Sequence, residues 1–589
     1  MKVFNEQIGL ALSDELKKAL SVYRNQRGFD AKVWVKAKSY ILNEYMKSSR
    51  LNTVVVAVSG GVDSALVLSL VNFASKVEQS PIKKIVAINL PAINNAGATG
   101  QDKSYERALE LCQGLNLELL TINVSPIQSQ IISLAENQLG LVADDWAKGQ
   151  TVAYSRTPVL YGMTSILSSN GFSSIIGGTT NRDEGAYLGY VGKASDGMVD
   201  VQLISDLHKS EVYASAQYLN VPESIMNAVC TGDMFDGRVD EEVFGTSYDF
   251  VELYLWYINL STQEQTSFKN GLSVNSLNSF NVYAKNLENL HSYNAHKYLA
   301  GSPAVHFDIM ESNVKGGWQI QKNTWLEQLK VSPDVTTLNH LGKFTEEFSK
   351  AITKEITFED ISVSNIHDIG VSKVITINNL FSNEFLEILL DEISKNSLDS
   401  INEIGGKKNV DIAYLNKSKR INIYHTKLSQ LIWYKVKSHL SSIEEINDYS
   451  YCDNKGHAYW KPVGINPYVK LNQYCEGGLL VPHYDGAHEY SDKHKNMKTL
   501  IIYLEDNEAA TRIIDDHQGN IKNINRNFAD GNKEDIISAE DILFHQPSQK
   551  NRVMIFDNKL LHDSTLLKNG RKTILLTEVV YEKITYPQV

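Results

Sequence analysis

The stretch "VVVAVSGGVDSALVLSLV", residues 54–71, decides the fold of the N-terminal half of the chain. An apolar run breaks at Ser59, Gly60 and Gly61, and a second apolar segment with helical spacing follows Asp63 and Ser64. The pattern predicts a buried strand, a glycine turn and a helix. Such a turn brings backbone amides and a helix N-terminus close to a phosphate. Because Asp63 adds a carboxylate that suits magnesium, we expect a nucleotide-binding loop here.

Strand-like and helical patterns alternate on both sides of this loop, from about residue 30 to 220. Further strands are predicted over 83–90, 117–124 and 173–179, and helices over 31–46, 64–75, 104–115 and 208–220. This alternation is typical of a doubly wound parallel α/β sheet. Ligands of such sheets bind beyond the carboxyl ends of the strands, where the glycine loop is expected.

The glycine loop resembles the SGGxDS loop of the ATP pyrophosphatases, and no Walker pattern GxxxxGK[ST] is present. Residues 175–212, "IIGGTTNRDEGAYLGYVGKASDGMVDVQLISDLHKSEV", closely resemble the corresponding segment of ammonia-dependent NAD synthase. The resemblance covers about residues 30–305. Its matched positions are Gly178, Thr179, Asn181, Glu184, Lys193, Asp196, Gly197, Asp200, Lys209 and Thr231.

This resemblance implies an adenine nucleotide alpha hydrolase-like domain that uses ATP and Mg²⁺. A carboxylate attacks the α-phosphorus, pyrophosphate leaves, and ammonia displaces AMP to give an amide. As isolated residues, Lys193 and Lys209 would more often be solvated surface lysines. The implied roles are ATP binding by Ser59, Gly60, Gly61, Asp63, Ser64, Thr179, Lys209 and Thr231, magnesium binding by Asp63 and Glu184, substrate binding by Arg156, Lys193 and Asp200, and catalysis by Asp63, Lys193, Asp200 and Lys209.

The segment "QTVAYSR", residues 150–156, departs from the NAD synthase pattern. Gln150 and Tyr154 replace an Asn and an Arg, while Ala153 and Arg156 remain. Two interpretations stay open: amidation of deamido-NAD, or a recruited scaffold that amidates another carboxylate in a specialised pathway. No glutaminase domain is attached, so free ammonia, ammonia from a partner, or an amine would be the nucleophile.

The C-terminal half has a different pattern, and we expect domains at 1–310 and 366–589 joined by a connecting segment, 311–365. Strand-like runs dominate the second domain, at 372–381, 465–474, 497–506, 551–559 and 571–582. Helices are predicted over 383–396 and 428–440. The pattern indicates an α+β domain around a β-sandwich or jelly-roll core.

A second site is predicted from His483, Asp485 and His562, the ligand set of a two-histidine, one-carboxylate iron centre. A lone HxD pair is weak evidence. Tyr474 lies nine residues before His483, however, and Lys572 lies ten residues after His562. Both spacings resemble the prolyl 4-hydroxylase-like branch of iron(II)/2-oxoglutarate dioxygenases, which have a double-stranded β-helix (jelly-roll) fold.

The dioxygenase resemblance implies Fe²⁺, 2-oxoglutarate and O₂ as cofactors and hydroxylation of a small molecule. Tyr474 and Lys572 would hold the far carboxylate of 2-oxoglutarate, and Arg571 is the adjacent alternative anchor. The two halves together indicate a bifunctional enzyme that acts in successive steps on one small molecule. A chain in which one domain is catalytically dead and regulatory is the other class of function that stays open.

Composition limits the partners. The net charge of −12 over 589 residues argues against nucleic-acid or anionic-membrane binding. The four cysteines are scattered without CxxC spacing, and neither a signal peptide nor a membrane-spanning apolar run is visible. We expect a cytoplasmic enzyme of small molecules. The NAD synthase resemblance implies a homodimer through the N-terminal domain.

Overall fold

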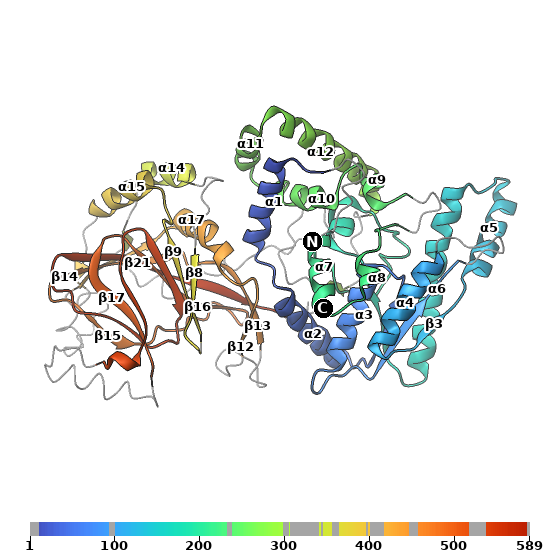
Figure 1. Ribbon diagram of the computed structural model, residues 1–589, viewed down its shortest axis with the longest axis horizontal. Coiled ribbons are helices and arrows are strands. Elements are labelled where there is room, and N and C mark those ends of the chain that lie inside the picture. Colours follow the sequence, from blue (N-terminus) through green and yellow to red (C-terminus); the bar gives the residue numbers. More distant parts are fainter. Residues whose placement is uncertain are drawn as a thin grey trace. The chain divides into compact units, whose positions relative to one another are not determined.

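The chain divides into two compact units in a computed structural model (Figure 1). The first unit contains Met1–Lys322, Ser442–Tyr459 and Ile584–Val589, and the second contains Asn323–Ser441 and Trp460–Lys583. Most of the expected connecting segment, 311–365, lies outside the described residues. The structure describes residues 11–92, 101–232, 238–297, 305–306, 341–342, 345–355, 364–370, 372–395, 399–400, 418–446, 458–516 and 537–585.

The first unit contains the predicted parallel sheet, with strand order β3-β2-β1-β4-β5-β6. Successive side chains of β1 point to opposite faces. Val54 and Val56 pack in one apolar cluster with α2, α3 and α7, whereas Val55 packs in another with α6. Helices therefore cover both faces. The strands are β1 (Thr53–Ala57), β2 (Lys84–Asn89), β3 (Leu119–Thr121), β4 (Ser174–Gly178), β5 (Val201–Gln202) and β6 (Val305–His306).

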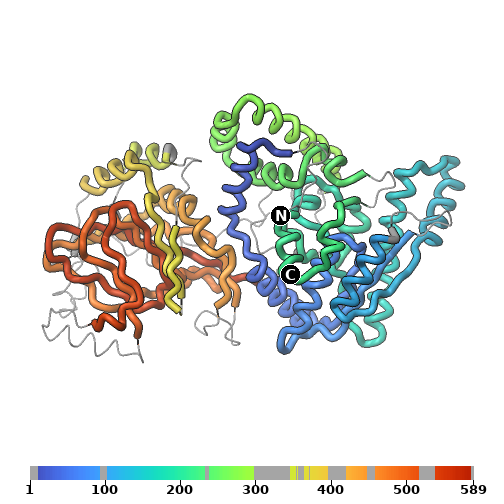
Figure 2. The backbone as a smooth tube through the Cα atoms, viewed as in Figure 1, coloured from blue at the N-terminus to red at the C-terminus, as the bar shows by residue number. Residues whose placement is uncertain are grey.

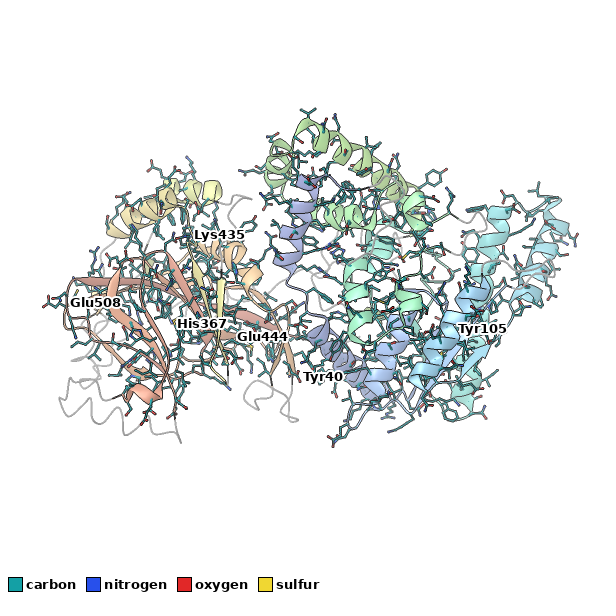
Figure 3. All side chains as sticks on the ribbon, viewed as in Figure 1. Tyr40, Tyr105, His367, Lys435, Glu444 and Glu508 are labelled. Atoms are coloured by element: carbon teal, nitrogen blue, oxygen red, sulfur yellow. The ribbon has the colours of Figure 1, made fainter. Side chains whose placement is uncertain are left out.

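The strand order reverses at β1, because β2 and β3 lie on one side of it and β4 lies on the other. The carboxyl ends of β1 and β4 therefore form the switch point at which such sheets bind ligands. The helices that flank the sheet are α2 (Ala31–Ser48), α3 (Val62–Ser75), α4 (Gln101–Leu115, with Tyr105 labelled in Figure 3), α5 (Ser125–Leu139), α6 (Asp145–Ser169) and α7 (Lys209–Tyr218).

A set of elements, most of them helices, lies outside the α/β alternation, and Figure 2 shows those helices that follow α7 in green. All residues of the α10 helix except Asp249 are buried. These elements are α1 (Asp14–Arg27), a π-helical turn (Asp183–Leu188), α8 (Glu223–Met226), α9 (Asp240–Phe244), α10 (Tyr248–Tyr257), α11 (Thr262–Asn270), α12 (Val274–Asn294), a 3₁₀ turn (Ala295–Lys297) and a short strand β12 (Glu444–Ile446).

The second unit is rich in antiparallel sheet. Its larger sheet runs β10-β11-β14-β21-β16-β19-β9-β8, and a smaller sheet runs β15-β20-β17-β18. The strands are β7 (Leu341–Gly342), β8 (Ser364–Asp368), β9 (Lys373–Asn378), β10 (Asp399–Ser400), β11 (Ser418–Tyr424), β13 (Ala458–Ile465), β14 (Tyr468–Cys475), β15 (Leu480–His483), β16 (His494–Tyr503), β17 (Asn507–Ile514), β18 (Ile542–Ser548), β19 (Arg552–Asp557), β20 (His562–Ser564) and β21 (Arg571–Lys583).

The two sheets share one apolar core. Ile501, Tyr503 and Ile574 of the larger sheet cluster there with Ala509 and Ile513 of the smaller. The helices are α14 (Glu346–Glu355), α15 (Asn383–Ser394) and α17 (Thr426–Val436), with 3₁₀ turns at Lys437–His439 and Ala539–Asp541. A buried ion pair joins α17 to α14: Lys435 Nζ, labelled in Figure 3, lies 3.3 Å from Glu355 Oε1.

One strand prediction is wrong in detail. Residues 465–474 form the end of β13 and most of β14, with a break at Asn466 and Pro467. Pro467 has no backbone N–H to donate to a ladder, and the Asn466 side chain accepts a hydrogen bond from the Tyr468 amide at 2.9 Å. The chain therefore turns where an uninterrupted strand was expected. Among the described residues, no helix is long and apolar enough to cross a membrane.

Candidate functional sites

The glycine loop between β1 and α3 has the compact shape expected of a phosphate-binding turn. Gly60 has a φ of +83°, and a Cβ on it would lie 2.1 Å from the carbonyl oxygen of Ser104. Only glycine is tolerated at this position. Inside the loop, the Ser59 and Ser64 hydroxyls lie 3.1 Å apart, and the Gly61 amide donates to Ser59 Oγ at 3.3 Å.

Beside this loop, Lys209 holds two carboxylates together. Its Nζ donates to Asp63 Oδ2 at 2.7 Å and to Glu184 Oε1 at 3.0 Å. Asn181 Nδ2 donates to both carboxylates at 2.8 Å, and the Tyr248 hydroxyl donates to Glu184 Oε1 at 2.8 Å. Four segments of the chain, α3, the end of β4 with its π-helical turn, α7 and α10, therefore converge at the switch point.

The charged groups of this cluster shift one another's pKa values. Burial raises the pKa of Glu184 to about 7, although Lys209 acts in the opposite direction. Burial alone would lower the pKa of Lys209, but Asp63 and Glu184 keep it well above its ordinary value. Carboxylate and amide oxygens are ligands that Mg²⁺ prefers, and once Glu184 is ionised the two carboxylates exceed the charge of one lysine. Asp63 and Glu184 therefore fit a magnesium ion.

A second layer of residues, which was not predicted from the sequence, fixes the position of Lys209. Asp183 Oδ1 lies 2.6 Å from His208 Nδ1, and Asp183 Oδ2 accepts the Lys209 backbone N–H at 2.7 Å. The Tyr23 hydroxyl lies 2.8 Å from His208 Nε2. Burial raises the pKa of Asp183 to about 7 and lowers that of His208 to about 3. The available signal was adjacency, since Asp183 precedes Glu184 and His208 precedes Lys209.

The other predicted residues lie outside this hydrogen-bonded cluster. Lys193 and Thr231 are exposed, and Thr179 follows β4 directly. Arg156 Nε donates to the Leu90 carbonyl, after β2, at 3.1 Å. Asp200 is tied to the middle of β4, because its carboxylate accepts the Ile176 N–H at 2.7 Å.

The second site lies where β15 ends and β20 begins. His483 and His562 are paired across these strands, and their ligand atoms and those of Asp485 all lie within 4.8 Å of one another. His483 Nε2 lies 3.6 Å from Asp485 Oδ1, and His562 Nε2 lies 3.4 Å from Asp485 Oδ2. The structure therefore brings together all three predicted iron ligands.

Backbone carbonyls orient both imidazoles. His483 Nδ1 lies 2.9 Å from the Val481 oxygen, and His562 Nδ1 lies 2.9 Å from the Leu560 oxygen. Each Nδ1–H donates to its carbonyl, so each Nε2 presents a lone pair towards Asp485. Burial lowers the pKa of His562 to about 4, which keeps the ring neutral. Asp485 also accepts a hydrogen bond from the Thr499 hydroxyl.

The two predicted 2-oxoglutarate anchors are cross-strand partners. Tyr474 of β14 and Lys572 of β21 are paired in register, and both side chains are buried. Lys572 Nζ donates to Ser564 Oγ at 2.8 Å and lies 5.8 Å from the Tyr474 ring centroid. Arg571 points to the opposite face, where its Nε donates to Glu505 at 2.8 Å. The geometry therefore favours Lys572 over Arg571 as the anchor.

Comparison with known proteins gives the family of the N-terminal half. The NAD synthase family model matches residues 34–299. The NH₃-dependent NAD(+) synthetase of Campylobacter jejuni (strain RM1221) is 33% identical over 208 residues, 35% of this chain and 75% of the relative. That of Pyrococcus horikoshii is 32% identical over 213 residues, 36% of this chain and 74% of the relative.

Solved structures were also compared. The NMN synthetase of Francisella tularensis is 26% identical, with a TM-score of 0.35 over 45% of this chain and 96% of that chain. Both curated relatives are more than 30% identical to this chain, and the match covers about three quarters of each. The parallel sheet described above is consistent with this relationship. Through its N-terminal half, the chain belongs to the NAD synthase family.

Proposed function

We propose that the chain is a bifunctional enzyme, and that its N-terminal half converts deamido-NAD, ATP and ammonia into NAD, AMP and pyrophosphate. The observation that carries this proposal is the joining of Asp63, Glu184 and Lys209 beside the glycine loop. The printed activity of the matched relatives agrees with it.

In the proposed mechanism, the loop amides, the Ser59 and Ser64 hydroxyls and the Lys209 ammonium bind the ATP phosphates, with Thr179 and Thr231 beside the nucleotide. Magnesium held by Asp63 and Glu184 would supply positive charge to the departing pyrophosphate. Lysine next to the phosphates stabilises the negative charge that develops on phosphorus. The substrate carboxylate attacks the α-phosphorus, and ammonia then displaces AMP from the acyl group.

On the acyl side, we assign Arg156, Lys193 and Asp200 to substrate binding. Lys193 is exposed, so its ammonium is accessible to an incoming anion. Tyr154 is exposed, and its hydroxyl donates a hydrogen bond to Gln150 Oε1 at 3.1 Å. These two residues therefore bind each other, and the cation that is typical of the family is missing here. The alternative, amidation of another carboxylate, is favoured by this substitution.

The decisive experiment for this half is NAD formation from deamido-NAD, Mg-ATP and ammonium, followed by mass spectrometry. Turnover would support the NAD synthase assignment. ATP binding without NAD formation would favour a recruited ligase. Other carboxylates would then be screened as substrates, with pyrophosphate release as the readout. An Asp63→Ala variant should lose that release, and Asp145→Ala, on an exposed side chain, is its control.

For the C-terminal half, we propose an iron(II)/2-oxoglutarate dioxygenase that hydroxylates a small molecule, with a double-stranded β-helix formed by the two sheets. The observation that carries it is the clustering of His483, Asp485 and His562. Lys572 supports it, because a buried ammonium whose hydrogen-bond partner is a serine suits a carboxylate ligand. Iron bound here would supply O₂ activation coupled to oxidative decarboxylation of 2-oxoglutarate.

Metal analysis after anaerobic loading with ferrous iron tests this assignment. The wild-type protein should bind iron and release succinate from 2-oxoglutarate, and His483→Ala should do neither. His488→Ala is the matched control, since His488 lies on the same loop outside the triad. A wild-type protein that binds no iron would instead support a regulatory C-terminal half.

We also propose that the N-terminal half forms a homodimer and that the functional boundaries are 1–310 and 366–589. Large apolar side chains stay exposed around the α5–α6 connection. The exposed fractions of Leu139, Leu141 and Trp146 are 68%, 66% and 66%. A second copy would cover these side chains, and sedimentation of the purified chain tests this.

A further inference from the structure

One face of the larger sheet in the second unit faces the triad, whose histidines lie on β15 and β20 of the smaller sheet, and we call it the triad face. Residues opposite one another in an antiparallel pair, and residues two apart on one strand, share a face. Tyr474 pairs with Lys572, and Tyr503 pairs with Ile574, so these four side chains lie together. Thr499, on the same face of β16, donates to Asp485 and so brings this face to the triad.

Arg420 of β11 lies on the triad face as well. It pairs with Asn472, which is two residues before Tyr474 on β14. Its charge interacts with Asp485 and with Tyr474, so the guanidinium lies within electrostatic range of the iron ligands. The triad face therefore carries two cationic side chains, Lys572 and Arg420, separated by the β14 strand.

The contacts of Arg420 leave part of its guanidinium available. Nε donates to Asn472 Oδ1 at 2.7 Å, which fixes the plane of the group. Within the part of the chain that the structure describes, no carboxylate forms an ion pair with Arg420, and its two Nη nitrogens have no hydrogen-bond acceptor. The side chain is half-buried, and burial lowers its pKa. A partly desolvated guanidinium with an oriented, unused edge suits an oxyanion that binds through two hydrogen bonds.

In the proposed function, Lys572 binds the far carboxylate of 2-oxoglutarate. Arg420 is therefore available to bind a second anion. We infer that Arg420 binds a carboxylate or phosphate group of the molecule that is oxidised, and that the C-terminal half therefore acts on an anionic small molecule. The inference rests on the proposed iron/2-oxoglutarate function. Asn472 acts as the positioning residue that orients the guanidinium.

The test uses the full chain, loaded anaerobically with ferrous iron and 2-oxoglutarate, whose visible charge-transfer absorption reports cofactor binding. Matched probes are then added: nicotinate against nicotinamide, and nicotinamide mononucleotide against nicotinamide riboside. The first pair differs in a carboxylate and the second in a phosphate. The measurements are the shift of the absorption band and the stimulation of succinate formation in air.

We expect an anionic member of a pair to bind, and the pair that responds distinguishes carboxylate from phosphate. Arg420→Met should weaken that binding about tenfold or more, with half-saturation by 2-oxoglutarate unchanged. Arg420→Lys, which keeps charge but loses the two-pronged geometry, should fall between. Asn472→Ala should weaken probe binding less than Arg420→Met.

Three results would overturn the inference. The first is a charge-transfer band that responds to neither anion, and the second is an equal response to the neutral partner of each pair. The third is an Arg420→Met variant that has a lower melting temperature but binds the probe normally. That result would mean that Arg420, which is paired in register with Asp399, has only a structural role. An absent charge-transfer band in the wild type would instead refute the underlying iron site.

Discussion

Lys572→Met should stabilise the ligand-free protein while it removes 2-oxoglutarate binding. The Lys572 side chain is 1% exposed, and burial lowers its pKa from 10.5 to about 7. Since one pKa unit is about 1.36 kcal/mol, this lowering of the pKa means that the folded state destabilises the charged form of Lys572 by about 5 kcal/mol. Loss of the hydrogen bond to Ser564 offsets about 1 kcal/mol of the gain. The expected stabilisation near pH 7 is therefore up to about 4 kcal/mol.

The sign of the pH dependence follows from proton binding. Between pH 7 and 10.5 the unfolded chain keeps the Lys572 proton and the folded protein loses it, so wild-type stability rises with pH across this window. The stability gap between variant and wild type should be widest at or below pH 7 and should narrow as the pH rises towards 10.5. Chemical denaturation at pH 6, 7, 8 and 9 measures the gap directly.

Lys498→Met is the control, because Lys498 is also buried in the same sheet but has a carboxylate partner. Lys498 Nζ lies 3.3 Å from Asp557 Oδ1, so its loss should destabilise the protein. Calorimetry of the iron-loaded protein should show 2-oxoglutarate binding weakened about 10²–10³-fold by Lys572→Met, because the ligand carboxylate loses its partner. A variant that is less stable than wild type at pH 7 and binds 2-oxoglutarate normally would refute the reasoning.

Four other changes test the two sites. Asp485→Asn should lower the iron content after anaerobic loading to less than a tenth, since the carboxylate ligand is lost; full occupancy would contradict the triad. Asp63→Ala should abolish ATP-dependent pyrophosphate release, and unchanged release would remove the nucleotide assignment. Gly60→Ala should destabilise the first unit by about 1–3 kcal/mol in denaturation, because its φ is +83° and its Cβ would meet Ser104. Trp146→Glu should yield monomers in sedimentation if the exposed apolar surface is the dimer contact.

Strands β1 to β4 of the first unit were predictable because they lie in apolar runs and their flanking helices have clear periodicity. The two-residue strands β5 and β6 were not predicted. The glycine loop and the NAD synthase family were also predicted; the comparisons confirm the family, and the parallel sheet is consistent with it. The α10 helix was not predicted. All of its residues except Asp249 are buried, so "YDFVELYLWY" lacks the broad exposed polar face from which a helical period is read.

In the second unit, β17 shows how a buried charge hides a strand. Arg512 interrupts the apolar pattern of "NEAATRII", yet it is 4% exposed and donates to Asp563 at 2.6 Å and 3.0 Å. The same limit applies to Asp183, His208 and Arg420. Each makes its hydrogen bond to a residue that is distant in sequence or on a neighbouring strand. No fixed sequence spacing identifies such a pair from a single sequence.

The balance of charge differs between the two sites and indicates what each is built to receive. At the first site Lys209 lies between two carboxylates, so the protein supplies excess negative charge, which suits a divalent cation. On the triad face the buried Lys572 and the half-buried Arg420 have, among the described residues, polar but uncharged hydrogen-bond partners, Ser564 and Asn472. Burying a cation without a carboxylate partner destabilises a protein, and a bound anion offsets that loss of stability. Two such cations, on strands either side of β14, agree with the proposed binding of two separate anions, a cosubstrate and a substrate.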